Sequence, residues 1–202
     1  MSEYSQIQTY IKSVPENFKD IIRQYADLLD SLGLESKYFT SEQKWGLLHT
    51  LWLGGDAEEQ LFNNGWCQLH IRPYVTGWIP EERDEPQDTW LEVSLLFLTV
   101  EIENPKDEIK SLLWGIMKKF SDKFPDSSGV YLTNEVTDGK PWEALTYGEE
   151  GIWEFDAAIL PKYLSFNYKD YPADEMFTKI NEHSIFVARK AIWQTEPWLI
   201  ID

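Results

Sequence analysis

The sequence predicts an α+β protein with a largely antiparallel sheet, an N-terminal helical segment and helices packed on the sheet. Apolar residues recur at helical spacing in the first third and after residue 105, whereas the middle and the C-terminal part alternate or run apolar as strands do. The order of helices, strands, one helix and further strands is typical of this class. With 202 residues, 43 % of them hydrophobic, we expect one domain over 1–202, with a helical subdomain over 1–64 as the alternative.

The first third predicts three helices. An amphipathic helix is expected over 15–32, because its apolar residues follow a three-to-four spacing, Pro15 suits a first turn and Gly33 suits a helix end. A second helix begins at Thr40, where Thr40 and Gln43 have the spacing of a capping box. A short third helix is expected from Asp56 to the Asn64–Gly65 pair.

The middle of the chain predicts two strands and a helix. Residues 67–75 alternate between apolar and polar side chains, and Pro73 indicates an edge strand or a bulge. Residues 90–102 are apolar at nearly every position, which predicts a central strand covered on both faces. A helix follows Asn104–Pro105, since four apolar residues then recur at helical spacing and lysines gather at its end.

The C-terminal third returns mainly to strands. We expect them over 129–136, 142–147, 152–160 and 163–168, with a short helix from Pro172 to about Asn181 and a closing strand over 197–201. The pattern of 184–193 fits a strand or a helix equally well.

The charge balance argues against two classes of partner. The chain has 18 Lys and Arg against 35 Asp and Glu, a net charge of −17, and residues 51–105 hold eleven acids against two bases. Nucleic acids and anionic membranes attract clustered Lys and Arg. The N-terminus lacks the pattern of a signal peptide, and the longest apolar run is far below the ~20 residues of a membrane helix. We therefore expect a cytoplasmic protein that binds neither nucleic acid nor membrane; its oligomeric state stays open.

Motifs for catalysis, metals or cofactors are missing from the sequence. There is no phosphate-binding glycine motif and no paired-histidine metal motif, so we predict no cofactor, no metal site and no catalytic residue. The single cysteine, Cys67, stands at an inward position of a strand and is expected to be a buried apolar residue. Glu101 and Glu103 would point to one face of a strand with roughly the 6–7 Å separation of a glycosidase pair, but their place near a strand end favours solvent exposure.

The ten tryptophans are the most unusual feature. Trp78 and Trp90 bracket an acidic stretch that is expected to be an exposed loop. An aromatic rim around carboxylates suits a basic protein surface, where Trp supplies binding energy and acids pair with Lys and Arg. It also suits a sugar. The predicted binding residues are Trp78, Glu81, Glu82, Asp84, Glu85, Asp88 and Trp90.

These features favour an acidic, tryptophan-rich protein-binding module. In composition and size the chain is similar to the acidic single-domain immunity and antitoxin proteins of bacteria, which implies an inhibitor that neutralises a basic toxin or enzyme. Two alternatives stay open. One is an enzyme on a small substrate that uses carboxylate and histidine acid–base groups, and the other is a carbohydrate-binding protein that uses tryptophan platforms.

Overall fold

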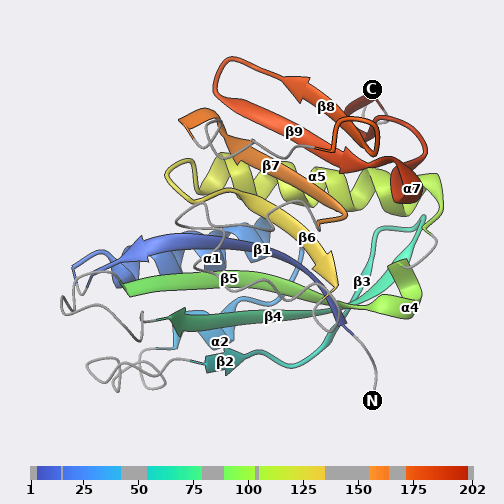
Figure 1. Ribbon diagram of the computed structural model, residues 1–202. Helices are drawn as coiled ribbons and strands as arrows, with labels where there is room; N and C mark the ends of the chain where they lie inside the picture. Colours follow the sequence, from blue (N-terminus) through green and yellow to red (C-terminus); the bar gives the residue numbers. More distant parts are fainter. Residues whose placement is uncertain are drawn as a thin grey trace.

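The computed structural model describes residues 4–14, 16–41, 54–78, 89–102, 105–134, 155–163 and 172–199. It confirms the α+β class (Figure 1). The elements in chain order are β1 (Tyr4–Ser13), α1 (Phe18–Ser31), α2 (Lys37–Thr40), β2 (Gly54–Asp56), β3 (Gln60–Asn63), β4 (Gln68–Trp78), β5 (Thr89–Leu98), α4 (Thr99–Ile102), α5 (Asp107–Lys123), β6 (Val130–Asn134), β7 (Ala157–Pro161), β8 (Met176–Ile180), β9 (Ser184–Arg189), α7 (Lys190–Trp193) and the 3₁₀ turn η2 (Pro197–Leu199).

The described strands form one sheet in the order β2-β4-β5-β1-β6-β7-β9-β8, and β3 also pairs with β4. Every pairing is antiparallel. The elements β1, α1, β4, β5, α5 and β6 form a β-α-β-β-α-β unit with the strand order β4-β5-β1-β6, which is the ferredoxin-like arrangement. Strands β7, β9 and β8 extend this unit beyond β6.

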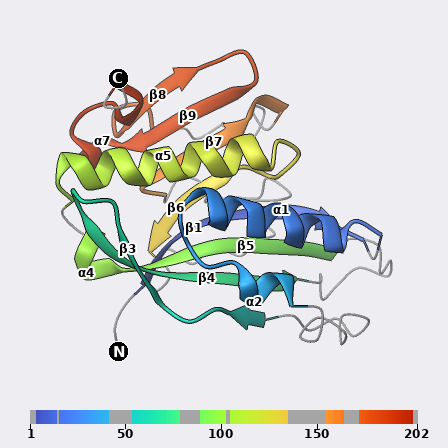
Figure 2. The same ribbon diagram turned by 180° about the vertical axis from the view of Figure 1, so that it is seen from behind.

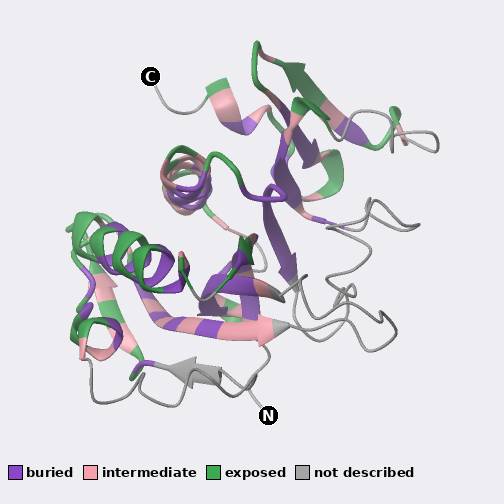
Figure 3. Cartoon of the chain, turned by 90° about the vertical axis from the view of Figure 1, so that its left-hand side faces the viewer, coloured by how far each residue is buried: buried purple, intermediate pink, exposed green. Residues whose placement is uncertain are grey.

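Helices α1 and α5 cover the same face of the sheet (Figure 2). Both are amphipathic, and their apolar faces share a core with the strands beneath them. Leu29 of α1, Met117 of α5 and Ile7 of β1 are fully buried members of this core. The outer face of α1 is exposed (Figure 3). The core thus ties the first strand of the chain to both helices.

An aromatic cluster fastens the C-terminal segment to α5. The Trp114 ring of α5 lies 5.2 Å from Phe186 of β9, 6.1 Å from Trp193 of α7 and 5.6 Å from Trp198 of η2, measured between centroids. Trp114 and Trp193 are each 1 % exposed. Edge-to-face contacts of this kind add to the hydrophobic gain from burying large rings.

The opposite face of the sheet has a polar centre. Gln8 of β1 pairs in register with Ser94 of β5, and both side chains are buried. Gln8 Nε2 donates to Thr133 Oγ1 of β6 at 3.5 Å. Among the residues that the structure describes, Gln8 Oε1 and Ser94 Oγ have no hydrogen-bond partner. This polar centre adjoins a second, apolar cluster on the same face, which includes Tyr10 and Tyr131.

Several helices and strands expected from the sequence are confirmed. Helix α1 lies within 15–32, and Gly33 follows it with φ of 75°. Strand β4, helix α5 and strands β6 and β7 also lie where they are predicted. The ambiguous stretch 184–193 is strand β9 followed by helix α7, so both interpretations apply to part of it.

The structure corrects several expectations. Residues 4–13, which we assign to no strand, form the central strand β1. The helix expected from Asp56 to Gly65 is replaced by strand β3 and a turn, because the four residues of β3 pair with β4. The strand predicted over 90–102 ends at Leu98, and residues 99–102 form helix α4. The helix predicted from Pro172 to Asn181 is replaced by strand β8, which pairs with β9. The closing strand over 197–201 is a 3₁₀ turn over its described residues.

The strand next to β4 is interrupted opposite Pro73, a residue of β4. Strand β2 pairs with residues 74–76 of β4, whereas β3 pairs with residues 68–71. Between them the Ala57 N–H donates to the Pro73 carbonyl at 3.0 Å. A proline has no N–H for a ladder, so a break in the neighbouring strand is the expected accommodation. The predicted helix start at Thr40 is wrong, because Thr40 ends helix α2 and Ser41 is extended. The rest of that predicted helix lies outside the described residues, as do the predicted strand over 142–147 and residues 164–168.

Candidate functional site

The turn between β3 and β4 presents an open tryptophan. The Trp66 side chain is 86 % exposed, more than any other large apolar side chain that the structure describes as exposed. It lines a hollow of about 400 Å³ between this turn and the start of α5. We call this the Trp66 hollow, and its lining residues are Asn64, Trp66, Asp107, Glu108, Ser111 and Leu112.

Two asparagines fix the turn that carries Trp66. Asn63 Oδ1 accepts the Gly65 N–H at 2.8 Å, and Asn64 Oδ1 accepts the N–H groups of Trp66 and Cys67, each at 3.0 Å. Gly65 has φ of 85°, a conformation that glycine adopts without the strain of a side chain. Asx side chains commonly close turns in this way. The backbone under Trp66 is therefore held while its ring stays in solvent.

The opposite wall of the hollow is the first turns of α5 and is acidic. Asp107 and Glu108 stand in the first turn, where carboxylates meet the positive end of the helix dipole. Asp107 Oδ1 lies 3.8 Å from the Nζ of buried Lys110, and the Asp107 side chain is itself largely exposed. Burial raises the pKa of Cys67, the Asn64 hydrogen bond opposes this shift, and the charge of Glu108 adds to it. The hollow thus offers an aromatic face and negative charge together.

A histidine–carboxylate pair lies at the same end of the molecule. Glu101 of α4 accepts the His70 backbone N–H at 2.8 Å through Oε2, and its Oε1 lies 2.6 Å from His70 Nδ1. The hydrogen bond to Glu101 raises the pKa of His70. Two further exposed apolar side chains flank this pair: Leu61 pairs in register with His70, and Val100 precedes Glu101.

The local charge at this end is mostly negative. Exposed carboxylates come from Glu58 and Glu59, just before β3, and from Asp107 and Glu108. Lys106, at the start of α5, is also exposed. Figures 1 and 2 both show β3, α4 and the start of α5 gathered at one end of the sheet. An exposed tryptophan with carboxylates beside it suits a cationic side chain, which can lie over the ring face and form ion pairs with the carboxylates.

The predicted binding residues lie elsewhere. Trp78 is the last residue of β4 and stands opposite Trp90 of β5 in register. Trp90 is half-buried and packs against the second core cluster, which includes Tyr10, Tyr131 and Phe155. The predicted acids Glu81, Glu82, Asp84, Glu85 and Asp88 lie outside the described residues.

The two tryptophan sites are at opposite ends of β4. Trp66 precedes the first residue of this 11-residue strand, and Trp78 is its last residue. At about 3.3 Å per residue, they are separated by about 30 Å or more. The structure therefore does not bring the predicted loop and the Trp66 hollow together.

The sequence contains a turn signal for the Trp66 hollow, which we interpret as the end of a helix. Asn63-Asn64-Gly65 is a strong turn sequence for a hairpin, yet we expect it to end a helix. Once it is assigned to a hairpin, an aromatic residue at the turn is expected in solvent. The contribution of Asp107 and Glu108 needs the tertiary packing of α5 beside this turn.

The remaining candidates have different outcomes. Cys67 is partly exposed, just outside β4, instead of buried in a strand. Glu101 stands in a helix, so it cannot form the predicted same-face strand pair, and Glu103 lies outside the described residues. Across the residues that the structure describes, no group of three or more His, Cys, Asp or Glu is placed to hold a metal ion.

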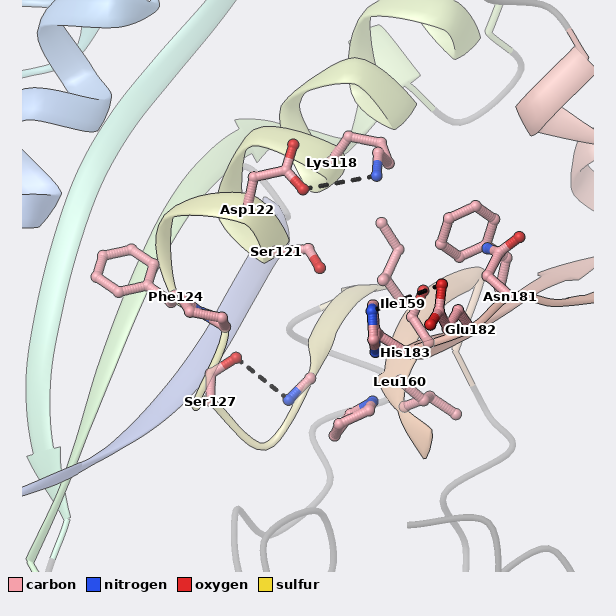
Figure 4. A pocket seen from close by; sticks show the side chains of 15 residues that line it. Lys118, Ser121, Asp122, Phe124, Ser127, Ile159, Leu160, Asn181, Glu182 and His183 are labelled. Carbon is pink, nitrogen blue, oxygen red and sulfur yellow. Dashed lines mark hydrogen bonds and ion pairs between the residues drawn. The ribbon is translucent and has the colours of Figure 1, made fainter. Parts of the chain in front are cut away.

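A larger cavity lies on the helix-covered side of the sheet. It occupies about 620 Å³ between the C-terminal half of α5, the turn before β6, strand β7 and the β8–β9 turn. Figure 4 shows Lys118 and Asp122 on one wall, with Glu182 and His183 on the other. The predicted tryptophans do not line it.

Comparisons with known proteins give no family assignment. No family model, no curated protein and no solved structure matches the chain. None of the helices in the described ranges has the length and apolar character that a bilayer crossing requires.

Proposed function

We propose that this protein is a binding module that engages a basic protein, as an inhibitor or immunity-type protein would engage a toxin or enzyme. The observation that carries the proposal is Trp66, 86 % exposed over a hollow that Asp107 and Glu108 line. The net charge of −17 supports a basic partner through long-range attraction.

The chemistry of the hollow favours an arginine or lysine side chain from the partner. A guanidinium or ammonium group over a Trp face gains a cation–π attraction, and nearby carboxylates accept its hydrogen bonds. Trp is also among the residue types whose truncation costs most at protein interfaces. The fixed turn under Trp66 reduces the ordering cost that binding would otherwise incur.

The proposal is tested by affinity capture from a lysate of the source organism. The bait is the full chain, compared with Trp66→Ala and with the double variant Asp107→Asn/Glu108→Gln. Ile180→Ala is the matched control, because Ile180 is an exposed apolar residue on β8. A fifth bait neutralises the five acids of the predicted loop.

We expect the wild type and Ile180→Ala to retain a basic protein in stoichiometric amount. About 0.5 M salt should release it, because screening at that ionic strength confines charge interactions to a few ångström. Both hollow variants should lose it. Loss with the loop variant and retention by Trp66→Ala would move the interface to residues 78–90. Retention of no basic protein would contradict the proposed function.

A further inference from the structure

The cavity beside α5 has a buried floor and a polar rim. Its floor includes Ser127, Phe186 and Ile159, all buried, whereas Asp122 and His183 at its rim are exposed. Its volume of about 620 Å³ lies within the range of sites for small molecules. It is separate from the Trp66 hollow, with which it shares no lining residue.

The turn that forms one edge of the floor is held rigidly. Three successive carbonyl oxygens, those of Ser127, Ser128 and Gly129, each accept a side-chain hydroxyl: Tyr163 at 3.2 Å, Tyr131 at 2.5 Å and Thr9 at 2.6 Å, respectively. Gly129 has φ of 117° and lines the cavity with its backbone. The backbone that carries the Ser127 side chain is therefore held in place before any ligand arrives.

Ser127 is a buried polar side chain with hydrogen-bonding capacity left over. Its Oγ accepts the Gly129 N–H at 3.4 Å, which is a long hydrogen bond. A serine hydroxyl donates one hydrogen bond and accepts two. Within the described part of the chain this hydroxyl makes no other hydrogen bond, so its proton and one lone pair are available to a molecule in the cavity.

Each wall of the rim carries a carboxylate beside a nitrogen-bearing side chain. Lys118 Nζ lies 3.6 Å from Asp122 Oδ1 on α5, and His183 Nε2 lies 3.9 Å from Glu182 Oε2 on the β8–β9 turn. Figure 4 shows the two pairs on either side of the opening. Each wall thus offers hydrogen-bond donors and acceptors side by side, which a neutral polar molecule can use without carrying a charge.

The floor also offers an apolar, aromatic surface. Phe186 is 8 % exposed, its ring lies under Lys118 Nζ at 5.4 Å, and its packing against Trp114 keeps it in place. We propose that this cavity binds a small neutral polyhydroxylated molecule of the size of a mono- or disaccharide. Such a molecule both donates and accepts hydrogen bonds and presents C–H groups to an apolar floor.

The proposal is tested by isothermal titration calorimetry of the full chain with neutral sugars. The probes are glucose, galactose, mannose, N-acetylglucosamine, maltose and lactose, with glucose 6-phosphate and glucosamine as charged counterparts. The variants are Ser127→Ala and Asp122→Ala. Ser128→Ala is the matched control, because Ser128 Oγ is buried with no hydrogen-bond partner in the described ranges and Ser128 does not line the cavity. Thermal unfolding of each variant verifies its folding, and Asp122 is exposed, so its variant keeps the test valid if Ser127→Ala does not fold.

We expect at least one neutral sugar to bind, about tenfold more weakly to each cavity variant and equally well to Ser128→Ala. Glucose 6-phosphate and glucosamine should each bind more weakly than glucose. Binding by none of the neutral sugars overturns the proposal. Binding that both cavity variants leave unchanged, or that is tighter for a charged counterpart, overturns it as well.

Discussion

Glu101 holds His70 from two directions. One carboxylate oxygen accepts the His70 backbone N–H at 2.8 Å, and the other lies 2.6 Å from Nδ1 of the ring. Through this pair α4 is fastened to β4 at the end of the molecule that carries the Trp66 hollow. The protonated imidazole donates to a carboxylate, and this hydrogen bond raises the pKa of His70 above 6.5.

This pair should make stability depend on pH. Because the folded state favours protonated His70, its contribution is fully present below pH 6.5 and is lost as the pH rises through the raised pKa. In the wild type the urea midpoint should fall as the pH rises through the pKa of His70. We expect this fall to disappear in Glu101→Gln and to remain in His183→Gln, a control on the exposed β8–β9 turn. A fall of equal size in Glu101→Gln would contradict the assignment. Circular dichroism between pH 5 and 9 measures it.

Two tryptophans should differ strongly in what they contribute to stability. Trp114→Ala removes a ring that is 1 % exposed and contacts three other aromatic residues, so it should cost about 3–5 kcal/mol of unfolding free energy. Trp66→Ala should change it by less than about 0.5 kcal/mol, because the ring lies in solvent. Urea denaturation of both variants measures the difference, and a large loss with Trp66→Ala would show that its ring is packed.

Two glycines give a second matched pair. An added Cβ at Gly129 would lie 2.9 Å from Tyr131 Oη and 3.1 Å from the Ile159 carbonyl, at φ of 117°. Gly129→Ala should therefore destabilise the protein by about 1–3 kcal/mol. At Gly115, within α5, an added Cβ would meet no neighbouring atom of the described residues within 4 Å, so Gly115→Ala should stabilise the protein by up to about 1 kcal/mol. Thermal unfolding of both variants tests the pair; equal effects would be inconsistent with it.

Lys110 is a buried lysine whose stem and charge can be tested separately. Its Nζ donates to the Trp193 carbonyl at 3.2 Å, and its side chain is 6 % exposed. Lys110→Met keeps most of the stem and removes a buried charge, so it should cost less than about 1.5 kcal/mol. Lys110→Ala also leaves a cavity and should cost about 2–5 kcal/mol. Equal losses in urea denaturation would show that the ammonium group dominates.

The sequence predicted most of the fold where one periodicity extends over many residues. Helices α1 and α5 follow from their apolar spacing, and β4 follows from its alternation. Strand β1 was missed because it mixes polar residues into both faces, and its buried Gln8 and Thr9 give no apolar pattern. Strand β8 is held by its pairing with β9, a tertiary contact that local spacing does not encode.

The candidate site is harder to predict from the sequence than the fold. We predict a surface of Trp and acidic residues over 78–90, whose acids lie outside the described residues, and the structure places Trp66 beside Asp107 and Glu108. Its location depends on bringing Asn64 and Trp66 beside Asp107, which are more than 40 positions away along the chain. That proximity is a product of the fold, as is the cavity between α5 and the β8–β9 turn.

The most direct test of the binding proposal is the dissociation constant of the captured basic partner for the purified wild-type chain and for Trp66→Ala. Isothermal titration calorimetry at low salt measures both, with Ile180→Ala as the control. We expect Trp66→Ala to weaken binding by at least about tenfold, as loss of a central Trp does at interfaces, and Ile180→Ala to match the wild type. An unchanged dissociation constant for Trp66→Ala would contradict the assignment of the Trp66 hollow as the binding site.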